Sequence, residues 1–165
     1  METVYYDYLD SPIGSLMLAG DGENLVELGF PDGKAARRHQ PGWVLDSEPF
    51  TECKRQLQRY FAGNLRDFDI PLAPRGTEFQ LLVWDALRTI PYGETVSYGE
   101  LARQIGRPAA SRAVGAANGK NPIPVIIPCH RVIGSTGSLV GFGGGLPTKQ
   151  QLLALEREAI APGLL

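Results

Sequence analysis

The sequence predicts an α/β protein of the α+β type, with an N-terminal αβ domain followed by a mostly helical domain that contains a helix-turn-helix. Three observations favour this fold class. Short apolar segments fill the N-terminal region, apolar residues recur with helical spacing in the C-terminal half, and a stretch with Pro and Gly at residues 72–76 lies between them. We therefore expect one domain over residues 1–74 and a second over residues 75–165.

The first domain is expected to form a small sheet with one helix. Turn residues at 11–14 and 20–22 separate three apolar segments that we assign to strands, namely residues 4–9, 15–19 and 24–30. Residues 31–49 have an irregular pattern, a helix is predicted over residues 49–62, and residues 68–72 can return as a strand. No catalytic constellation is evident in this domain.

The second domain opens with helices. Thr77 can cap the first, whose apolar stripe ends at residues 91–93, Pro-Tyr-Gly. A second helix is predicted over residues 97–105, residues 106–108 break it, and a third follows over residues 109–118. A helix, a tight turn and another helix are typical of the DNA-binding helix-turn-helix.

The third predicted helix is thin, because most of its side chains are small. These are Ala109, Ala110, Ser111, Ala113, Gly115, Ala116 and Ala117. A thin helix can pack tightly against a neighbouring helix, or it can enter the minor groove of DNA, which is only about 6 Å wide. Arg112 is the one long side chain in its first turns.

One reactive position stands out in the second half of the chain. Cys129 lies directly beside His130 and Arg131, either of which can assist a thiol, because a cysteine attacks only as thiolate. Prolines at 122, 124 and 128 disfavour a helix, so residues 121–131 are expected to form a stiff extended strand that ends in a turn. The alternative is a buried core thiol with no chemical role.

The other cysteine and the histidines indicate little further chemistry. Cys53 belongs to an apolar pattern with helical spacing, so packing is its expected role. With only His39 and His130 in addition to the two cysteines, no convincing zinc cluster can be assembled, and we expect no metal. A disulfide between the two cysteines is not expected in an intracellular chain.

Charge is distributed unevenly along a chain whose formal net charge is −2. Residues 1–94 hold nine Lys and Arg against fifteen Asp and Glu, whereas residues 95–150 hold six against one. A basic segment in an acidic protein is what a phosphate-facing surface needs; a solvated basic face is the alternative. The sequence has neither a long apolar span nor a signal segment, so we expect a soluble, cytoplasmic protein without membrane partners.

Several motifs together resemble one family. Residues 128–131, Pro-Cys-His-Arg, are preceded by Asn121-Pro122 and followed by Val132-Ile133-Gly134 and a glycine-rich loop, and Tyr98 and residues 112–115 precede them. This ordered set, which with Glu156 covers residues 75 to 157, resembles the active-site signature of the O6-alkylguanine-DNA alkyltransferases. The resemblance implies a ribonuclease-H-like N-terminal domain that supports a C-terminal domain for DNA binding and alkyl transfer.

The resemblance also implies an activity. Cys129 would accept the alkyl group from O6-alkylguanine, with O4-alkylthymine left open, once per molecule and without a cofactor. His130 would take the thiol proton, Glu156 on a helix over residues 148–158 would orient the imidazole, and Tyr98 would donate to the leaving base. Asn121 would act as a hinge. On the residues alone, Glu156 also fits an ordinary surface carboxylate and Tyr98 a core residue.

Duplex DNA is the implied partner, bound through the minor groove by a protein expected to be monomeric, with cooperative binding left open. The resemblance makes Arg112 a finger that fills the space of an extruded nucleotide; a phosphate contact is the alternative. The implied DNA-facing residues are Tyr98, Arg107, Ala109, Ala110, Ser111, Arg112 and Ser135. The implied base pocket is formed by Asn118, Pro124, Val132, Phe142 and Gly143.

Two pocket positions depart from the pattern of some relatives. Phe142 stands where tyrosine is frequent, and Gly143 stands where a serine can bond the O6 atom. The bare Gly143 is expected to enlarge the pocket and to admit alkyl groups larger than methyl. A DNA lesion sensor without chemistry is the rival function, but the presence of Cys129, His130 and Glu156 together argues against it.

Overall fold

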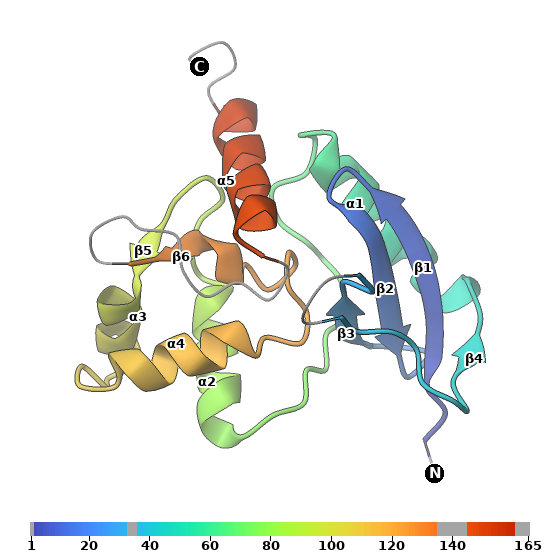
Figure 1. The fold of residues 1–165 in the computed structure, drawn as a ribbon, viewed down its shortest axis with the longest axis horizontal. Coiled ribbons are helices and arrows are strands. Elements are labelled where there is room, and N and C mark those ends of the chain that lie inside the picture. The colour runs from blue at the N-terminus through green and yellow to red at the C-terminus, as the bar shows by residue number, and fades with distance from the viewer. Residues whose placement is uncertain (1, 33–35, 135–144, 161–165) are drawn as a thin grey trace. The chain divides into compact units, whose positions relative to one another are not determined.

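The computed structural model describes residues 2–32, 36–134 and 145–160, and it divides into two units, Met1–Arg75 and Gly76–Leu165 (Figure 1). The first is built around a sheet, and the second is mostly helical. This architecture agrees with the predicted fold class. Among the described residues, no helix is both long and apolar enough to span a bilayer.

A four-stranded sheet with strand order β3-β2-β1-β4 forms the centre of the first unit. Its strands are β1 (Tyr5–Ser11), β2 (Gly14–Gly20), β3 (Leu25–Gly29) and β4 (Val44–Leu45). The first three are antiparallel neighbours, as alternating segments separated by short turns require, and β4 pairs in parallel with β1. The Ser11 hydroxyl accepts from the Ile13 amide and donates to the Gly14 carbonyl, which closes the first hairpin.

Helix α1 (Thr51–Phe61) packs its apolar stripe into this unit, and Cys53, Leu57 and Tyr60 on that stripe are buried. Burial raises the pKa of the Cys53 thiol to about 12, so this cysteine stays protonated and has the packing role expected of it. Two details differ from the prediction. Residues 68–72 supply only an isolated bridge from Leu72 to Leu25, and β4 lies in the region expected to be irregular.

The second unit is a group of helices beside a two-stranded parallel sheet. The helices are α2 (Glu78–Leu87), α3 (Tyr98–Gln104), α4 (Ser111–Gly119) and α5 (Leu146–Ile160), and the strands are β5 (Val96–Ser97) and β6 (Val132–Ile133). Helices α2, α3 and α4 pack against one another, and the Trp84 indole nitrogen of α2 donates to the Ala117 carbonyl of α4 across 2.8 Å. This packing gives the predicted helix-turn-helix, α3 and α4, a rigid support.

Local sequence explains where two of these helices begin. Thr77 caps α2 and exchanges hydrogen bonds with Gln80, and Ser97 caps α3 in the same way with Glu100. Both are capping boxes, in which a Ser or Thr and a residue three positions later satisfy two free backbone amides. The second box fixes the position of Tyr98, the first residue of α3.

Candidate active site

The segment around the reactive cysteine is folded, not extended. The Asn121 side chain accepts from the Ile123 amide at 3.0 Å and donates to the Ile127 carbonyl at 2.8 Å, while the Ile127 amide bonds the Ile123 carbonyl. Val125 takes a positive φ of 74°, and a 3₁₀ helix, η2 (Cys129–Arg131), follows. The predicted strand is therefore wrong, because the side chain of Asn121 satisfies the backbone groups that a neighbouring strand would otherwise bond.

Cys129 lies inside this folded segment and is only 3% exposed. Burial raises the pKa of its thiol to about 11, while a side-chain hydrogen bond from Asn121 and the charge of Lys149 act in the opposite direction. At neutral pH the thiol is therefore protonated and needs a base to become a nucleophile. Burial of the thiol is what the alternative of a core cysteine predicts, and the reactive role stays a prediction.

His130, the residue expected to act as the base, is completely buried. Its Nε2 lies 2.6 Å from Oε2 of Glu156, and its Nδ1 makes no hydrogen bond within the described residues. Burial lowers the pKa of His130, although the hydrogen bond and charge of Glu156 act to raise it. The imidazole is therefore neutral at rest. With Nε2–H donated to the carboxylate, Nδ1 has the lone pair that can accept a proton.

Glu156 projects from α5 and is completely buried too. Burial alone would raise the pKa of its carboxyl, but the hydrogen bonds and charges of His130 and Arg131 outweigh burial and hold the pKa at about 2. The Gly93 amide donates to Oε1 at 3.0 Å as well. Glu156 is therefore ionised and fixed in position.

We expect the stability of the protein to fall in acid because of Glu156. A carboxyl whose pKa drops on folding stabilises the native state above its unfolded pKa, near 4.5, and this contribution is lost as the pH falls toward 2. The free energy of unfolding, measured with urea from pH 6 to pH 2, should therefore decline less steeply in Glu156→Gln than in the wild-type protein. Equal slopes in both proteins would contradict the ionised, bonded state of this carboxylate.

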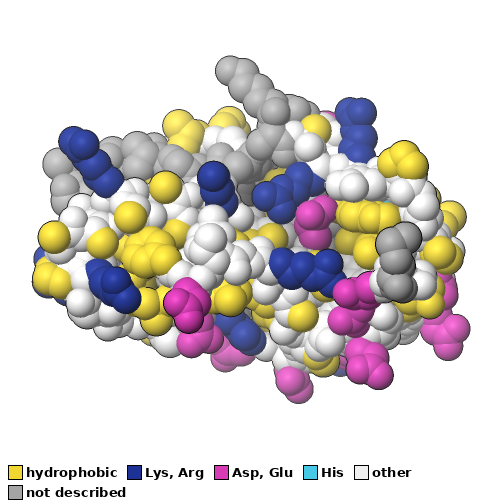
Figure 2. Space-filling view, turned by 90° about the horizontal axis from the view of Figure 1, so that it is seen from below, with side chains coloured by type: hydrophobic (Ala, Val, Ile, Leu, Met, Phe, Trp, Pro, Cys, Tyr) yellow, Lys and Arg dark blue, Asp and Glu magenta, His cyan; other side chains and the backbone are white. Residues whose placement is uncertain are grey.

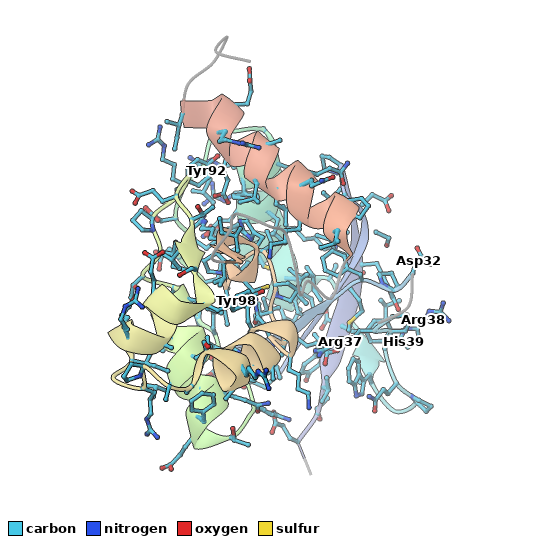
Figure 3. The ribbon with its side chains drawn as sticks, turned by 60° about the vertical axis from the view of Figure 1, so that its left-hand side comes forward. Asp32, Arg37, Arg38, His39, Tyr92 and Tyr98 are labelled. Carbon is cyan, nitrogen blue, oxygen red and sulfur yellow. The ribbon has the colours of Figure 1, made fainter. Side chains whose placement is uncertain are left out.

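Tyr98 and Asn118 meet beside the cysteine. The Asn118 side-chain nitrogen lies 3.4 Å from the Cys129 carbonyl, and Asn118 acts to lower the pKa of Tyr98. Burial raises the pKa of Tyr98 and keeps its hydroxyl protonated as a donor. Gly115 of α4 faces the Tyr98 ring, and a Cβ there would lie in ordinary van der Waals contact with the ring at 3.7 Å. Figure 3 shows Tyr98 at this junction of α3 and α4.

Two buried cations, Arg131 and Lys149, complete the site, and the contacts of neither were predicted. Arg131, a candidate thiol partner, forms an ion pair with Glu156 instead. Lys149 is completely buried on α5, donates to the Val132 carbonyl at 2.6 Å, and was missed. Its spacing could have revealed it, because residues 149, 152 and 156 share one helix face.

Replacing Lys149 by Met should slow reactions of the thiol by about tenfold or more, because a cation that favours the thiolate is lost and one pKa unit is a factor of ten. The rate of Cys129 alkylation by a small electrophile measures this effect. Arg157→Met, which removes an exposed cation from the same helix, is the control. Equal rates in the two variants would contradict an electrostatic role for Lys149.

The remaining predicted residues fall into three groups. Arg107, Ala109 and Arg112 are exposed, with Ala110 and Ser111 half-buried beside them at the start of α4. Pro124 and Val132 are buried with the cysteine segment. Ser135, Phe142 and Gly143 lie outside the described residues. The face drawn in Figure 2 has Lys and Arg side chains spread among apolar and uncharged ones, not merged into one basic field.

The part of the chain that the structure describes contains no group of three His, Cys, Asp or Glu side chains able to hold a metal ion. Cys53 and Cys129 are both free thiols. A buried thiol, an adjacent imidazole with a free nitrogen and an ionised carboxylate, on a unit with a helix-turn-helix, define a cysteine-dependent protein of the DNA-binding class.

Comparison with known proteins specifies the family. Residues 4–74 match the family model described as 6-O-methylguanine DNA methyltransferase, ribonuclease-like domain, and residues 78–158 match the one described as 6-O-methylguanine DNA methyltransferase, DNA binding domain. Together these cover most of the chain. The chain therefore belongs to the 6-O-methylguanine DNA methyltransferase family.

Relatives and solved structures agree. The chain is 55% identical over 153 residues to a methylated-DNA--protein-cysteine methyltransferase of Methanosarcina acetivorans, covering 93% of this chain and 98% of the relative. It is 55% identical over 154 residues to one of Mycolicibacterium paratuberculosis, covering 93% of each. A crystal structure of a Mycobacterium tuberculosis O6-methylguanine methyltransferase matches with a TM-score of 0.88 and 52% identity, over 98% of this chain and 96% of that one.

The same TM-score and identity hold for a Mycobacterium tuberculosis OGT in complex with DNA, over 94% of each chain. These likenesses extend over both units of the chain. The family predicted from the motifs around Cys129 is thus confirmed.

Proposed function

We propose that this protein repairs DNA by moving an alkyl group from O6 of guanine to the sulfur of Cys129, once and irreversibly. Family membership and the names of relatives that are 55% identical support the activity. The observation that carries the assignment to specific residues is the buried series Cys129, His130 and Glu156, in which Nδ1 of the imidazole is left to accept a proton.

The transfer is a displacement at carbon. The sulfur of Cys129 forms a bond to the alkyl carbon while the bond from that carbon to O6 breaks, and its electron pair stays on the purine. The thiol proton passes to His130, directly or through water, and the purine anion takes up one proton to become guanine. The product is a thioether, which offers water no good leaving group, so a molecule acts once and needs no cofactor.

The surrounding groups have supporting roles in this proposal. The Tyr98 hydroxyl donates to the departing purine as negative charge develops on it, and Asn118 orients that hydroxyl. Asn121 holds the folded segment that carries Cys129 and links it to the end of α4. The base pocket is completed by Pro124 and Val132, together with Phe142 and Gly143, which lie outside the described residues. Tolerance of alkyl groups larger than methyl stays a prediction.

DNA is the partner of the second unit, since its family model is that of a DNA-binding domain. We place α4 in the minor groove, because its N-terminal half exposes small side chains and Arg112. Arg112 then enters the base stack in place of the extruded nucleotide, and Arg107, Ala109, Ala110 and Ser111, with Ser135 outside the described residues, lie along the backbone. Residues 1–74 are the supporting domain in this proposal. We still expect the protein to be a monomer and to be located in the cytoplasm.

Stoichiometry tests this proposal. A duplex with one O6-methylguanine is incubated with increasing amounts of protein, and the restored guanine is counted. The expected plateau is one guanine per protein molecule. Several guanines per protein would contradict a one-time acceptor, and binding without any guanine restored would show a lesion sensor instead.

A further inference from the structure

Arg131 is a buried cation beside the proposed proton relay. Its side chain is only 6% exposed. Its guanidinium donates two hydrogen bonds to the Glu156 carboxylate, from Nε to Oε1 at 2.9 Å and from Nη2 to Oε2 at 3.0 Å. The third nitrogen, Nη1, donates to the Ile90 carbonyl at 2.7 Å. A fork of this kind fixes the plane of a carboxylate as well as its position.

The same carboxylate connects three parts of the second unit. Gly93, in the turn between α2 and β5, donates its amide to Oε1, and Tyr92 in that turn places its ring under the Arg131 guanidinium, 5.5 Å from centroid to carbon. Gly93 has a φ of 79°, and a Cβ there would lie 1.9 Å from an Ile160 side-chain atom, so the turn is tightly seated on α5. Figure 3 shows Tyr92 just before the β5 strand.

From this geometry we propose that Arg131 is a positioning residue for the transfer reaction. It aims Glu156 at Nε2 of His130 and offsets the carboxylate's charge, so that the imidazole stays neutral until it receives the thiol proton. The inference rests on the proposed function, in which His130 is the base.

The charges that face His130 support this role. Of the charged groups within the described residues, Glu156 favours the imidazolium, whereas Arg131 and Lys149 oppose it. A carboxylate without Arg131 would draw a proton onto Nε2 and Nδ1 together, leaving an imidazolium that has no lone pair for the thiol proton. A cation that shares the carboxylate prevents this loss of the base.

The first test is a titration of His130 by NMR in the free protein, with exposed His39 as the internal reference, because the chain has only these two histidines. In Arg131→Met the pKa of His130 should rise by about one unit or more, as loss of a nearby like charge predicts. In Arg131→Lys, which keeps the charge, it should stay near the wild-type value. Arg157→Met removes an exposed cation next to Glu156 in sequence and should change nothing.

The second test is the single-turnover rate of methyl transfer against pH. The acid decline of the rate in Arg131→Met should lie about one pH unit higher than in the wild-type protein. Within that decline the variant should be about tenfold slower, because one pKa unit of extra protonation is a factor of ten, and its rate should recover as the pH rises. Arg131→Lys should lose rate without this recovery, since it lacks the fork but not the charge. A merely structural arginine would lower the rate and the stability of Arg131→Met while leaving the titration of His130 unchanged, and that result would overturn the proposal.

Leaving Glu156 unpaired can prevent folding, so Arg131→Met is also combined with Glu156→Gln. The pKa of His130 should be higher in this double variant than in Glu156→Gln alone, and an equal pKa in the two proteins would also overturn the inference. The titration uses no DNA. If the wild-type protein transferred no methyl group, the proposed function would fail while the titration still decided the role of Arg131.

Discussion

Replacing His130 by Gln is expected to slow methyl transfer by about 10²–10⁴-fold, the range that a positioned general base contributes. The Cys129 thiol, with a pKa near 11, is protonated at neutral pH, and Gln offers no basic nitrogen to accept its proton. Single-turnover quench experiments with a duplex that holds one O6-methylguanine measure the rate. His39→Gln removes the exposed histidine and should react at the wild-type rate.

The pH dependence of the wild-type protein follows from the same residue. Burial lowers the pKa of His130 from its ordinary value of 6.5, so the neutral base persists below that pH and the rate should fall only in more acidic solution. In His130→Gln the decline set by the histidine should be replaced by a steady fall of the slower rate over the whole pH range, because the thiolate fraction of Cys129 falls with pH. A variant that reacts at nearly the wild-type rate, or that keeps the same decline in acid, would show that another group takes the proton.

Replacing Arg112 by Ala is expected to separate base extrusion from chemistry. Extrusion of a paired base costs a few kcal/mol, so loss of the side chain that fills the gap should slow repair of duplex DNA by about a hundredfold. Free O6-benzylguanine needs no extrusion, and its reaction with Arg112→Ala should keep the wild-type rate. Arg112 is exposed at the start of α4, so its loss should leave the fold intact.

Lys120, exposed at the other end of the same helix, provides the comparison. Lys120→Ala should weaken DNA binding in a salt-dependent way, as the loss of a phosphate contact does. The repair steps that follow binding should keep the wild-type rate. If Arg112→Ala behaved in this manner as well, Arg112 would be a phosphate contact and not an inserted finger.

The parts of the fold that sequence predicts well are those with local causes. The hairpin strands β1, β2 and β3 follow from alternation and turn residues, and α2 and α3 follow from apolar spacing after Thr77 and Ser97, both of which form the capping boxes. Strand β4 escaped prediction because its two residues, Val44 and Leu45, are exposed and gain their structure from pairing with distant β1. Non-local pairing leaves no periodic signal in so short a segment.

The same distinction between local and non-local causes applies to the candidate site. Cys129 and His130 are adjacent in the sequence, so their partnership could be predicted, and the family resemblance added Glu156. Prolines around Cys129 correctly excluded an α-helix, but not the short 3₁₀ helix η2, and the fold of residues 121–131 depends on one side chain, Asn121, bonding two backbone groups. Likewise, the pairing of Arg131 with Glu156 depends on how α5 packs against η2, which spacing along the chain does not express.

Measurement of the intact mass of the protein shows whether the alkyl group is transferred to Cys129. Wild-type protein and Cys129→Ala are each mixed with a duplex that carries one O6-methylguanine. We expect the wild-type protein to gain the mass of a single methyl group, in proportion to the lesion consumed, and peptide mapping to place this group on residue 129. An unchanged mass for the wild-type protein, or the same gain in Cys129→Ala, would contradict this transfer.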